Sequence, residues 1–132
     1  MNGSRPLIKG TDFVFVPTKD FEAAEQFYGG VLGLPVSKRY NHGIGGEFET
    51  GNLTLQLVDS KKIGGEFEPT SGAIALHVDD VEAARSELES RGVSFSGETV
   101  DSGVCYQAYF SDPDGNALIL HHRYAPRDVL PD

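Results

Sequence analysis

Histidine and tyrosine side chains of this chain could perform acid–base chemistry, and its glutamine side chains could orient a bound molecule. Tyr109 and His121 lie in two of its apolar runs, and either could give or take a proton at a bound carbonyl compound. Gln56 and Gln107 lie in similar runs and could orient that carbonyl by hydrogen bonding. If the protein is an enzyme, which is the alternative to the binding function given below, Tyr109 and His121 are its candidate catalytic residues, and it would be a metal-independent isomerase, lyase or cyclase.

Cys105 is the only cysteine, which rules out an intrachain disulfide and a paired-cysteine metal or redox site. A thiolate nucleophile would need a neighbouring base, and the sequence locates none, so we expect Cys105 to be a small buried side chain. The first residues carry no long apolar run of the signal-peptide type. These features predict a cytoplasmic protein.

The charge balance is acidic, with a formal net charge of -9 and a sequence pI near 4.8. No run of lysine and arginine is present to follow a phosphate backbone or an anionic membrane surface. No stretch approaches the roughly 20 apolar residues that span a bilayer. Nucleic acid and membrane are therefore not expected partners.

The elements that must position these residues come from an internal repeat. The sequence DFEAA at residues 20–24 returns as DVEAA at residues 80–84, each time after an alternating apolar run and at the start of a helical pattern. Asp20 and Asp80 are each placed to cap a helix N-terminus. A chain of 132 residues fits one domain, so the repeat indicates one domain of two similar halves.

Each half continues with three short extended runs, which the alternation of Leu53, Leu55 and Leu57 illustrates. Each half is expected to contain one strand, one helix and three further strands, and this order of elements, present twice, predicts an α+β fold. The expected parts are a first module at 11–58, a linker at 59–71, a second module at 72–124 and a tail at 125–132.

Three motifs give this chain a resemblance to a known family: FYGGVLGL at residues 27–34, ALHVDD at 75–80 and DPDGN at 112–116. Together they resemble the vicinal oxygen chelate superfamily, which holds glyoxalase I, extradiol dioxygenases, fosfomycin-modifying enzymes and bleomycin-resistance proteins. The resemblance covers about residues 11–124. It implies two βαβββ modules that form a curved mixed sheet, or cup, with the helices on its outer face.

The resemblance also implies where a metal ion would be bound. Carried over by motif, the four ligand positions of the metal-dependent relatives are occupied here by Phe13, Gln56, Ala73 and Ile119. Of these four side chains, Gln56 alone offers an oxygen, whereas a divalent ion needs several donors. We therefore expect no metal and no other cofactor, and neither a standard glyoxalase I nor an extradiol dioxygenase.

A displaced metal site is the alternative. His121 and His77 share the parity of the cup-facing positions but lie roughly 6.6 Å and 13 Å along their strands from the levels of the family's ligands. Such a site would combine His121 with Gln56 or with a glutamate, Glu47 or Glu49. Without it, His77 and His121 are polar residues of the cup wall.

The leading prediction is a metal-free protein that binds a small, partly aromatic organic molecule in the cup, as a bleomycin-resistance protein sequesters its drug. Its inward-facing residues would give an apolar wall with a few hydrogen-bonding groups, which is typical of a small-molecule pocket. The competing interpretation is that the same residues pack together as a second small core. The predicted binding residues are Phe13, Phe15, Thr54, Gln56, Ala73, Ala75, His77, Gln107, Tyr109, Ile119 and His121.

Two matters stay open at this level. The first is the direction of the side chains in residues 36–50, which lack a clean alternation. If Lys38 and Arg39 reach the cup, an anionic or carbonyl-bearing ligand is favoured. If Glu47 and Glu49 reach it, a cationic ligand is favoured. The resemblance further implies a homodimer, either with modules exchanged between chains or with chains side by side.

Overall fold

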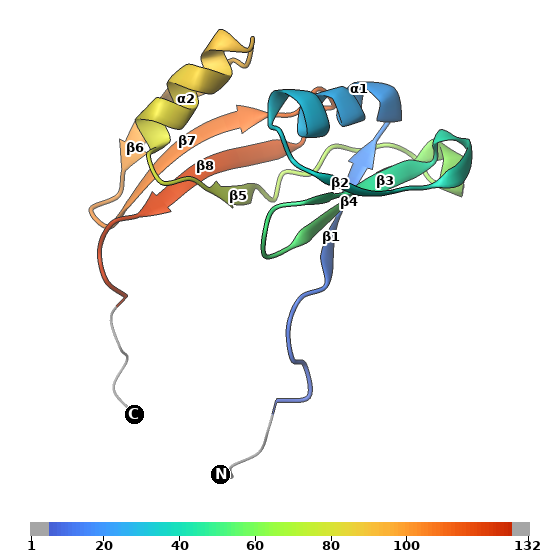
Figure 1. The fold of residues 1–132 in the computed structure, drawn as a ribbon, viewed down its shortest axis with the longest axis horizontal. Helices are drawn as coiled ribbons and strands as arrows, with labels where there is room; N and C mark the ends of the chain where they lie inside the picture. The colour runs from blue at the N-terminus through green and yellow to red at the C-terminus, as the bar shows by residue number, and fades with distance from the viewer. Residues whose placement is uncertain (1–5, 128–132) are drawn as a thin grey trace.

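The computed structural model describes residues 6–127, and the remainder of the predicted tail lies outside the described residues. Two mixed sheets of four strands lie beside one another, with the helices on one side of both (Figure 1). The predicted α+β fold of two βαβββ modules is confirmed. No helix within residues 6–127 is long and apolar enough to cross a membrane.

Both modules follow the same order of elements. The first contains β1 (Phe13–Thr18), α1 (Phe21–Glu25), the π-helical segment η1 (Gln26–Val31), β2 (Val36–Arg39), the short helix η2 (Asn41–Gly43), β3 (Gly45–Glu49) and β4 (Thr54–Asp59). A connection with one short helix, η3 (Lys61–Ile63), leads to the second module. The second contains β5 (Ile74–His77), α2 (Val81–Ser90), β6 (Phe95–Asp101), β7 (Cys105–Ser111) and β8 (Ala117–Arg123).

The repeated acidic residue begins each helix, as predicted. Asp20 accepts a hydrogen bond from the amide of Ala23 at 3.2 Å, and Asp80 accepts one from the amide of Ala83 at 3.0 Å. Each carboxylate thereby satisfies a helix N–H that has no partner within the helix. Gly33 follows η1 with a φ of 76°, a left-handed conformation that glycine adopts without steric cost.

The strand order is β1-β4-β3-β2 in the first sheet and β5-β8-β7-β6 in the second. In each module the first and last strands pair in parallel, with Phe15 opposite Gln56 and Ala75 opposite Ile119. The internal repeat therefore extends to the pairing of the strands. It also leaves β1 and β5 as edge strands, each paired on one side.

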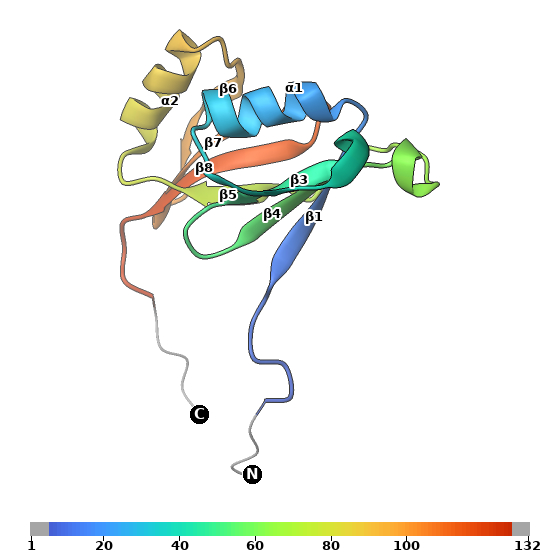
Figure 2. The same ribbon diagram turned by 45° about the vertical axis from the view of Figure 1, so that its right-hand side comes forward.

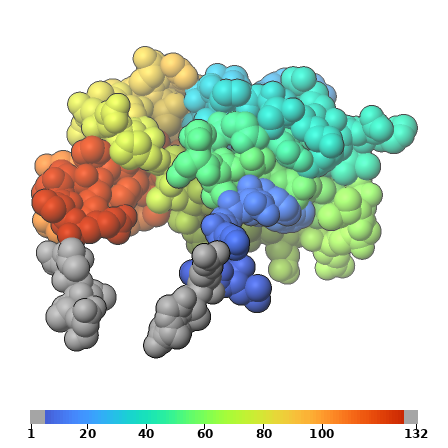
Figure 3. All heavy atoms as spheres, turned by 60° about the horizontal axis from the view of Figure 1, so that its bottom comes forward, coloured from blue at the N-terminus to red at the C-terminus, as the bar shows by residue number. Residues whose placement is uncertain are grey.

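The hydrophobic core lies between the helices and one face of each sheet (Figure 2). Leu55 and Leu57 of β4 and Leu118 and Leu120 of β8 are buried on this face. Residues of opposite parity on the same strands point away from the helices. Figure 3 turns this open side toward the viewer, and the N-terminal residues (blue) and C-terminal residues (red) occupy separate parts of it.

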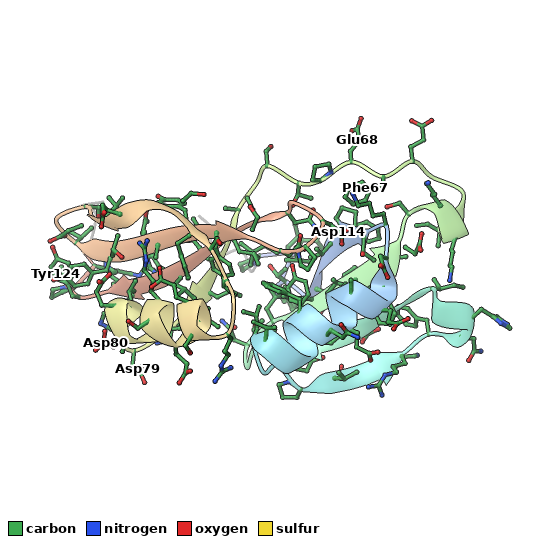
Figure 4. The ribbon with its side chains drawn as sticks, turned by 90° about the horizontal axis from the view of Figure 1, so that it is seen from above. Phe67, Glu68, Asp79, Asp80, Asp114 and Tyr124 are labelled. Atoms are coloured by element: carbon green, nitrogen blue, oxygen red, sulfur yellow. The ribbon has the colours of Figure 1, made fainter. Side chains whose placement is uncertain are left out.

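The turn between β7 and β8 joins the two modules. Asp114, labelled in Figure 4, accepts hydrogen bonds from the Thr18 hydroxyl at 2.5 Å and the Lys19 amide at 3.1 Å. The buried Asn116 side chain donates to the carbonyl of Pro17 at 2.8 Å. The DPDGN motif thus fixes the start of the second module's last strand against the end of β1.

Candidate functional site

The open face of the first sheet carries the predicted residues of the first module. Phe13 pairs with Thr54 and Phe15 with Gln56 across the parallel strands β1 and β4. The two phenylalanines are 51% and 43% exposed, which is unusual for rings of this size on a regular strand. They place an apolar surface beside an amide and a hydroxyl group.

The open face of the second sheet carries the other predicted residues. Ala75 and His77 of β5 pair with Ile119 and His121 of β8, and these pair in turn with residues of β7. Ala73, just before β5, is exposed. The residues of β7 on this face are Tyr109, which is opposite Ile119, and Gln107, which is opposite His121.

In one chain these two faces form an open surface divided between two sheets. A more enclosed groove, of about 380 Å³, lies instead on the helix side, where α2 and β5 approach the first module. It is lined largely by leucines, among them Leu32, Leu34 and Leu88. Of the predicted binding residues, Ala75 and His77 reach it.

The orientation of residues 36–50, which the sequence left open, is resolved by the strand pairing. Glu47 lies opposite Gln56 and Glu49 opposite Thr54, so both glutamates share the open face with these two residues. Thr54 donates a hydrogen bond to Glu49 at 2.6 Å. The pKa of Glu49 is lowered because the hydroxyls of Ser37 and Thr54 stabilise its carboxylate.

Tyr40 is a residue of this face that the sequence did not reveal. Its hydroxyl donates to the Glu47 carboxylate and accepts from the Gln56 amide nitrogen at 2.9 Å. Partial desolvation and the hydrogen bond to Glu47 raise the pKa of Tyr40. A register irregularity in β2 reverses the alternation just before Tyr40, so sequence periodicity carried no signal for it. Glu47, Phe48 and Glu49 do alternate in character, but which face the glutamates occupy follows only from the pairing of β3 with β4.

The basic residues of β2 take different positions. Arg39 forms an ion pair with Glu25 of α1, on the helix side of the sheet. Lys38 lies opposite Glu47 on the outer strand, with its ammonium group 5.8 Å from the centre of the Tyr40 ring. The first sheet therefore presents two carboxylates and one peripheral lysine on its open face.

The candidate acid–base residues lie on neighbouring strands of the second sheet. The Tyr109 hydroxyl donates to the side-chain oxygen of Gln107, and Gln107 is opposite His121. The His77 ring lies 5.8 Å from that of His122, and its Nε2 is 3.4 Å from Asp79. The contact between Tyr109 and Gln107 lies on the open face. His122 instead shares the parity of the buried Leu118 and Leu120, so the His77 ring turns toward the helix side, where it also lines the groove described above.

The prediction for the single cysteine is confirmed. Cys105 is buried, with 7% of its surface exposed. Its sulfur lies 3.9 Å from a guanidinium nitrogen of Arg123.

The side chains at the four family ligand positions do not fit a metal ion. Phe13, Ala73 and Ile119 carry no donor atom, and the amide nitrogen of Gln56 is bonded to Tyr40. Within residues 6–127, no group of three or more histidine, cysteine, aspartate or glutamate side chains is arranged to hold a metal. A displaced site would have to join His121 of the second sheet to Gln56 and the glutamates of the first.

A βαβββ repeat with open sheet faces defines the structural class of this protein. The chain belongs to the Glyoxalase/Bleomycin resistance protein/Dioxygenase superfamily, whose family model matches residues 10–120. The predicted resemblance is confirmed. No curated protein matches the chain.

Solved structures with the same fold include proteins of different functions. TnmS3, an antibiotic binding protein from Streptomyces sp. CB03234, is 28% identical with a TM-score of 0.74, over 90% of this chain and 99% of that one. Lactoylglutathione lyase from Agrobacterium tumefaciens is 22% identical with a TM-score of 0.74, over 86% and 93%. A glyoxalase/bleomycin resistance protein/dioxygenase from Nocardioides is 23% identical with a TM-score of 0.72, over 96% and 93%. The last two comparisons bear on fold alone.

Proposed function

We propose that this protein binds a small, partly aromatic organic molecule on its open sheet faces and sequesters it unchanged, without a metal ion. The observation that carries the proposal is the exposure of Phe13, Phe15 and Tyr109 beside hydrogen-bonding groups on the faces that the helices leave uncovered. Aromatic rings next to a few directional polar groups are the usual composition of a site for such a ligand. The similarity to TnmS3, described as an antibiotic binding protein, supports the same reading.

We propose a function without a metal ion because of the side chains at the four family ligand positions. Hydrocarbon side chains at Phe13, Ala73 and Ile119 leave Gln56 as the one donor of the four family positions. A single neutral amide is too weak a ligand set for a divalent ion.

The functional unit in this proposal is a homodimer in the cytoplasm. The edge strands β1 and β5 each leave one row of backbone groups unpaired within their sheet. Natural sheets cover or block such edges. A second copy would cover them, by exchange of modules or side by side. The single buried thiol, Cys105, suits a reducing compartment.

Capture of a ligand from cell extract tests the proposed function. The full chain is incubated with extract and washed, and the retained molecules are identified by mass spectrometry before and after prolonged incubation. We expect an aromatic compound that is recovered unchanged and is lost from Phe15→Ala. Phe67→Ala, in the connection between modules, is the control and should retain it. Equal capture by wild type and Phe15→Ala would refute binding at the open face.

Catalysis is the second candidate function, and the arrangement of Tyr109, Gln107 and His121 favours it. In that case the released molecule would differ from the one supplied. The conversion would be lost in Tyr109→Phe and His121→Asn, whereas binding would persist.

A further inference from the structure

We infer that the bound molecule carries a positively charged group, which Glu47 and Glu49 hold on the open face of the first sheet. This inference rests on the proposed function, because it names the chemical class of the ligand at the same site.

The first sheet presents two parallel rows of side chains that change in character from one strand to the next. One row runs from Phe15 through Gln56 to Glu47. Neighbouring strands are about 4.8 Å apart, so a ring on β1 and a carboxylate on β3 are separated by roughly 10 Å. A ligand lying across the strands would meet an aromatic surface at one end and a negative charge at the other.

The second row repeats this order with Phe13, Thr54 and Glu49. Two rows of the same polarity, both with half-exposed rings, make the face a combined aromatic and anionic surface rather than an isolated acidic group. Both features are needed to hold an aromatic cation, because stacking supplies affinity and the carboxylates supply charge selection.

The carboxylates of both rows can accept further hydrogen bonds. Glu49 accepts from Ser37 and Thr54, and Glu47 accepts from Tyr40. An ionised carboxylate has about four lone-pair sites, so each glutamate can still accept from an ammonium or amidinium group.

Positive charge that would compete for these carboxylates is held away from the centre of the face. Arg39 pairs with Glu25 on the helix side. Lys38 lies opposite Glu47 on the outer strand β2, but its ammonium group is directed at the Tyr40 ring, and no ion pair joins it to either glutamate among the described residues. The formal net charge of -9 also favours the approach of a cation over that of an anion.

The second sheet lacks this arrangement. The residue equivalent to Glu47, opposite the last strand of the second module, is Tyr109, and the ring positions of β1 are taken by Ala73 and Ala75 of β5. The two open faces therefore differ, and we assign the charged end of the ligand to the first module and its neutral polar end to the second.

Two fluorescent dyes of opposite charge test the inference with the full chain. Ethidium is an aromatic cation and anilinonaphthalene sulfonate an aromatic anion. We expect ethidium to bind at least about tenfold more tightly, and Glu47→Gln and Glu49→Gln each to weaken it by about tenfold, in line with loss of one charge-assisted contact. Raising the salt to about 0.5 M should weaken the binding of wild type more than that of the double variant.

The matched control is Glu68→Gln, which removes the same charge from a residue whose side chain points outward from the connection between modules (Figure 4). It should change ethidium binding by less than about twofold, because exposed charges further apart than the screening length interact weakly. Melting curves of all variants establish that each is folded.

The outcomes separate this inference from the function on which it rests. If both dyes bind with similar affinity, are lost in Phe15→Ala and are unaffected by the glutamate variants, charge selection is wrong and binding at the face stands. If neither dye binds, or if Phe15→Ala leaves both unchanged, both proposals are contradicted.

Discussion

The hydroxyl of Tyr28 lies 2.7 Å from a carboxylate oxygen of Asp112 and donates a buried hydrogen bond to it. Tyr28 belongs to the helical segment of the first module, and Asp112 begins the turn between the last two strands of the second. The other oxygen of Asp112 accepts from the amides of Asp114 and Asn116, at 2.9 Å each. Desolvation, followed by the charge of Asp112, raises the pKa of Tyr28. This contact is one of the buried links between the modules, alongside those that Asp114 and Asn116 make to the end of β1.

Replacing Tyr28 with phenylalanine tests the value of that pair. Because the variant keeps the ring and removes a donor from a buried carboxylate, we expect the free energy of unfolding to fall by about 1–3 kcal/mol. Urea unfolding should show this as a lower midpoint with an unchanged slope. Tyr106→Phe, at a ring that is 40% exposed, is the control and should shift the midpoint little.

Asn116→Ala should be more damaging. The Asn116 side chain donates to Pro17 and Asp112 at 2.8 Å, and its oxygen accepts from the Thr70 amide at the same distance. Its loss removes all three of these hydrogen bonds, and Asp112 keeps the Tyr28 hydroxyl as the remaining donor to the same oxygen. We expect a loss of roughly 3–5 kcal/mol, measured by urea unfolding. Asn41→Ala, in an exposed turn, provides the comparison. A loss below about 1 kcal/mol at Asn116 would contradict the structural role of the motif.

Gly45→Ala should prevent normal pairing of β3 with β4. A methyl group at Gly45 would lie 2.0 Å from the carbonyl oxygen of Leu57, and backbone atoms cannot move aside without disturbing the ladder. We expect a loss above about 4 kcal/mol or no folded protein, as seen by circular dichroism. Gly72→Ala has no atom within 4 Å of the added methyl and should fold normally.

Glu49 should titrate at an unusually low pH. The hydroxyls of Ser37 and then Thr54 lower the pKa of Glu49 below its ordinary value of 4.5, so the folded state holds this carboxylate ionised where the unfolded chain binds a proton. The resulting stabilisation is present above about pH 4.5 and is lost as the pH falls through the lowered pKa. Carbon-13 NMR titration should show this pKa rising toward 4.5 in Ser37→Ala. An identical titration in both proteins would refute the assignment.

Local chemistry accounts for what could be predicted from the sequence. The caps at Asp20 and Asp80 and the alternation around Gln56 depend on neighbours a few residues away, which the sequence displays directly. The repeat then gave the βαβββ order twice. That Phe13 and Ile119 offer no donor atom at the family's metal-ligand positions likewise follows from their residue types alone.

The sequence alone did not show which charged side chains lie on the open face of the first sheet. Whether Glu47 or Arg39 faces the ligand depends on the register between β3 and β4 and on the irregularity of β2 between Val36 and Lys38, since one added residue reverses every side chain that follows. The continuity of the predicted cup also depends on contacts far apart in sequence. The sequence by itself determined the elements and their repeat, because these arise from local propensity and periodicity. Only the tertiary structure decided which charged groups share a face and that one chain leaves its two sheets open, because strand register and module packing are set by long-range contacts.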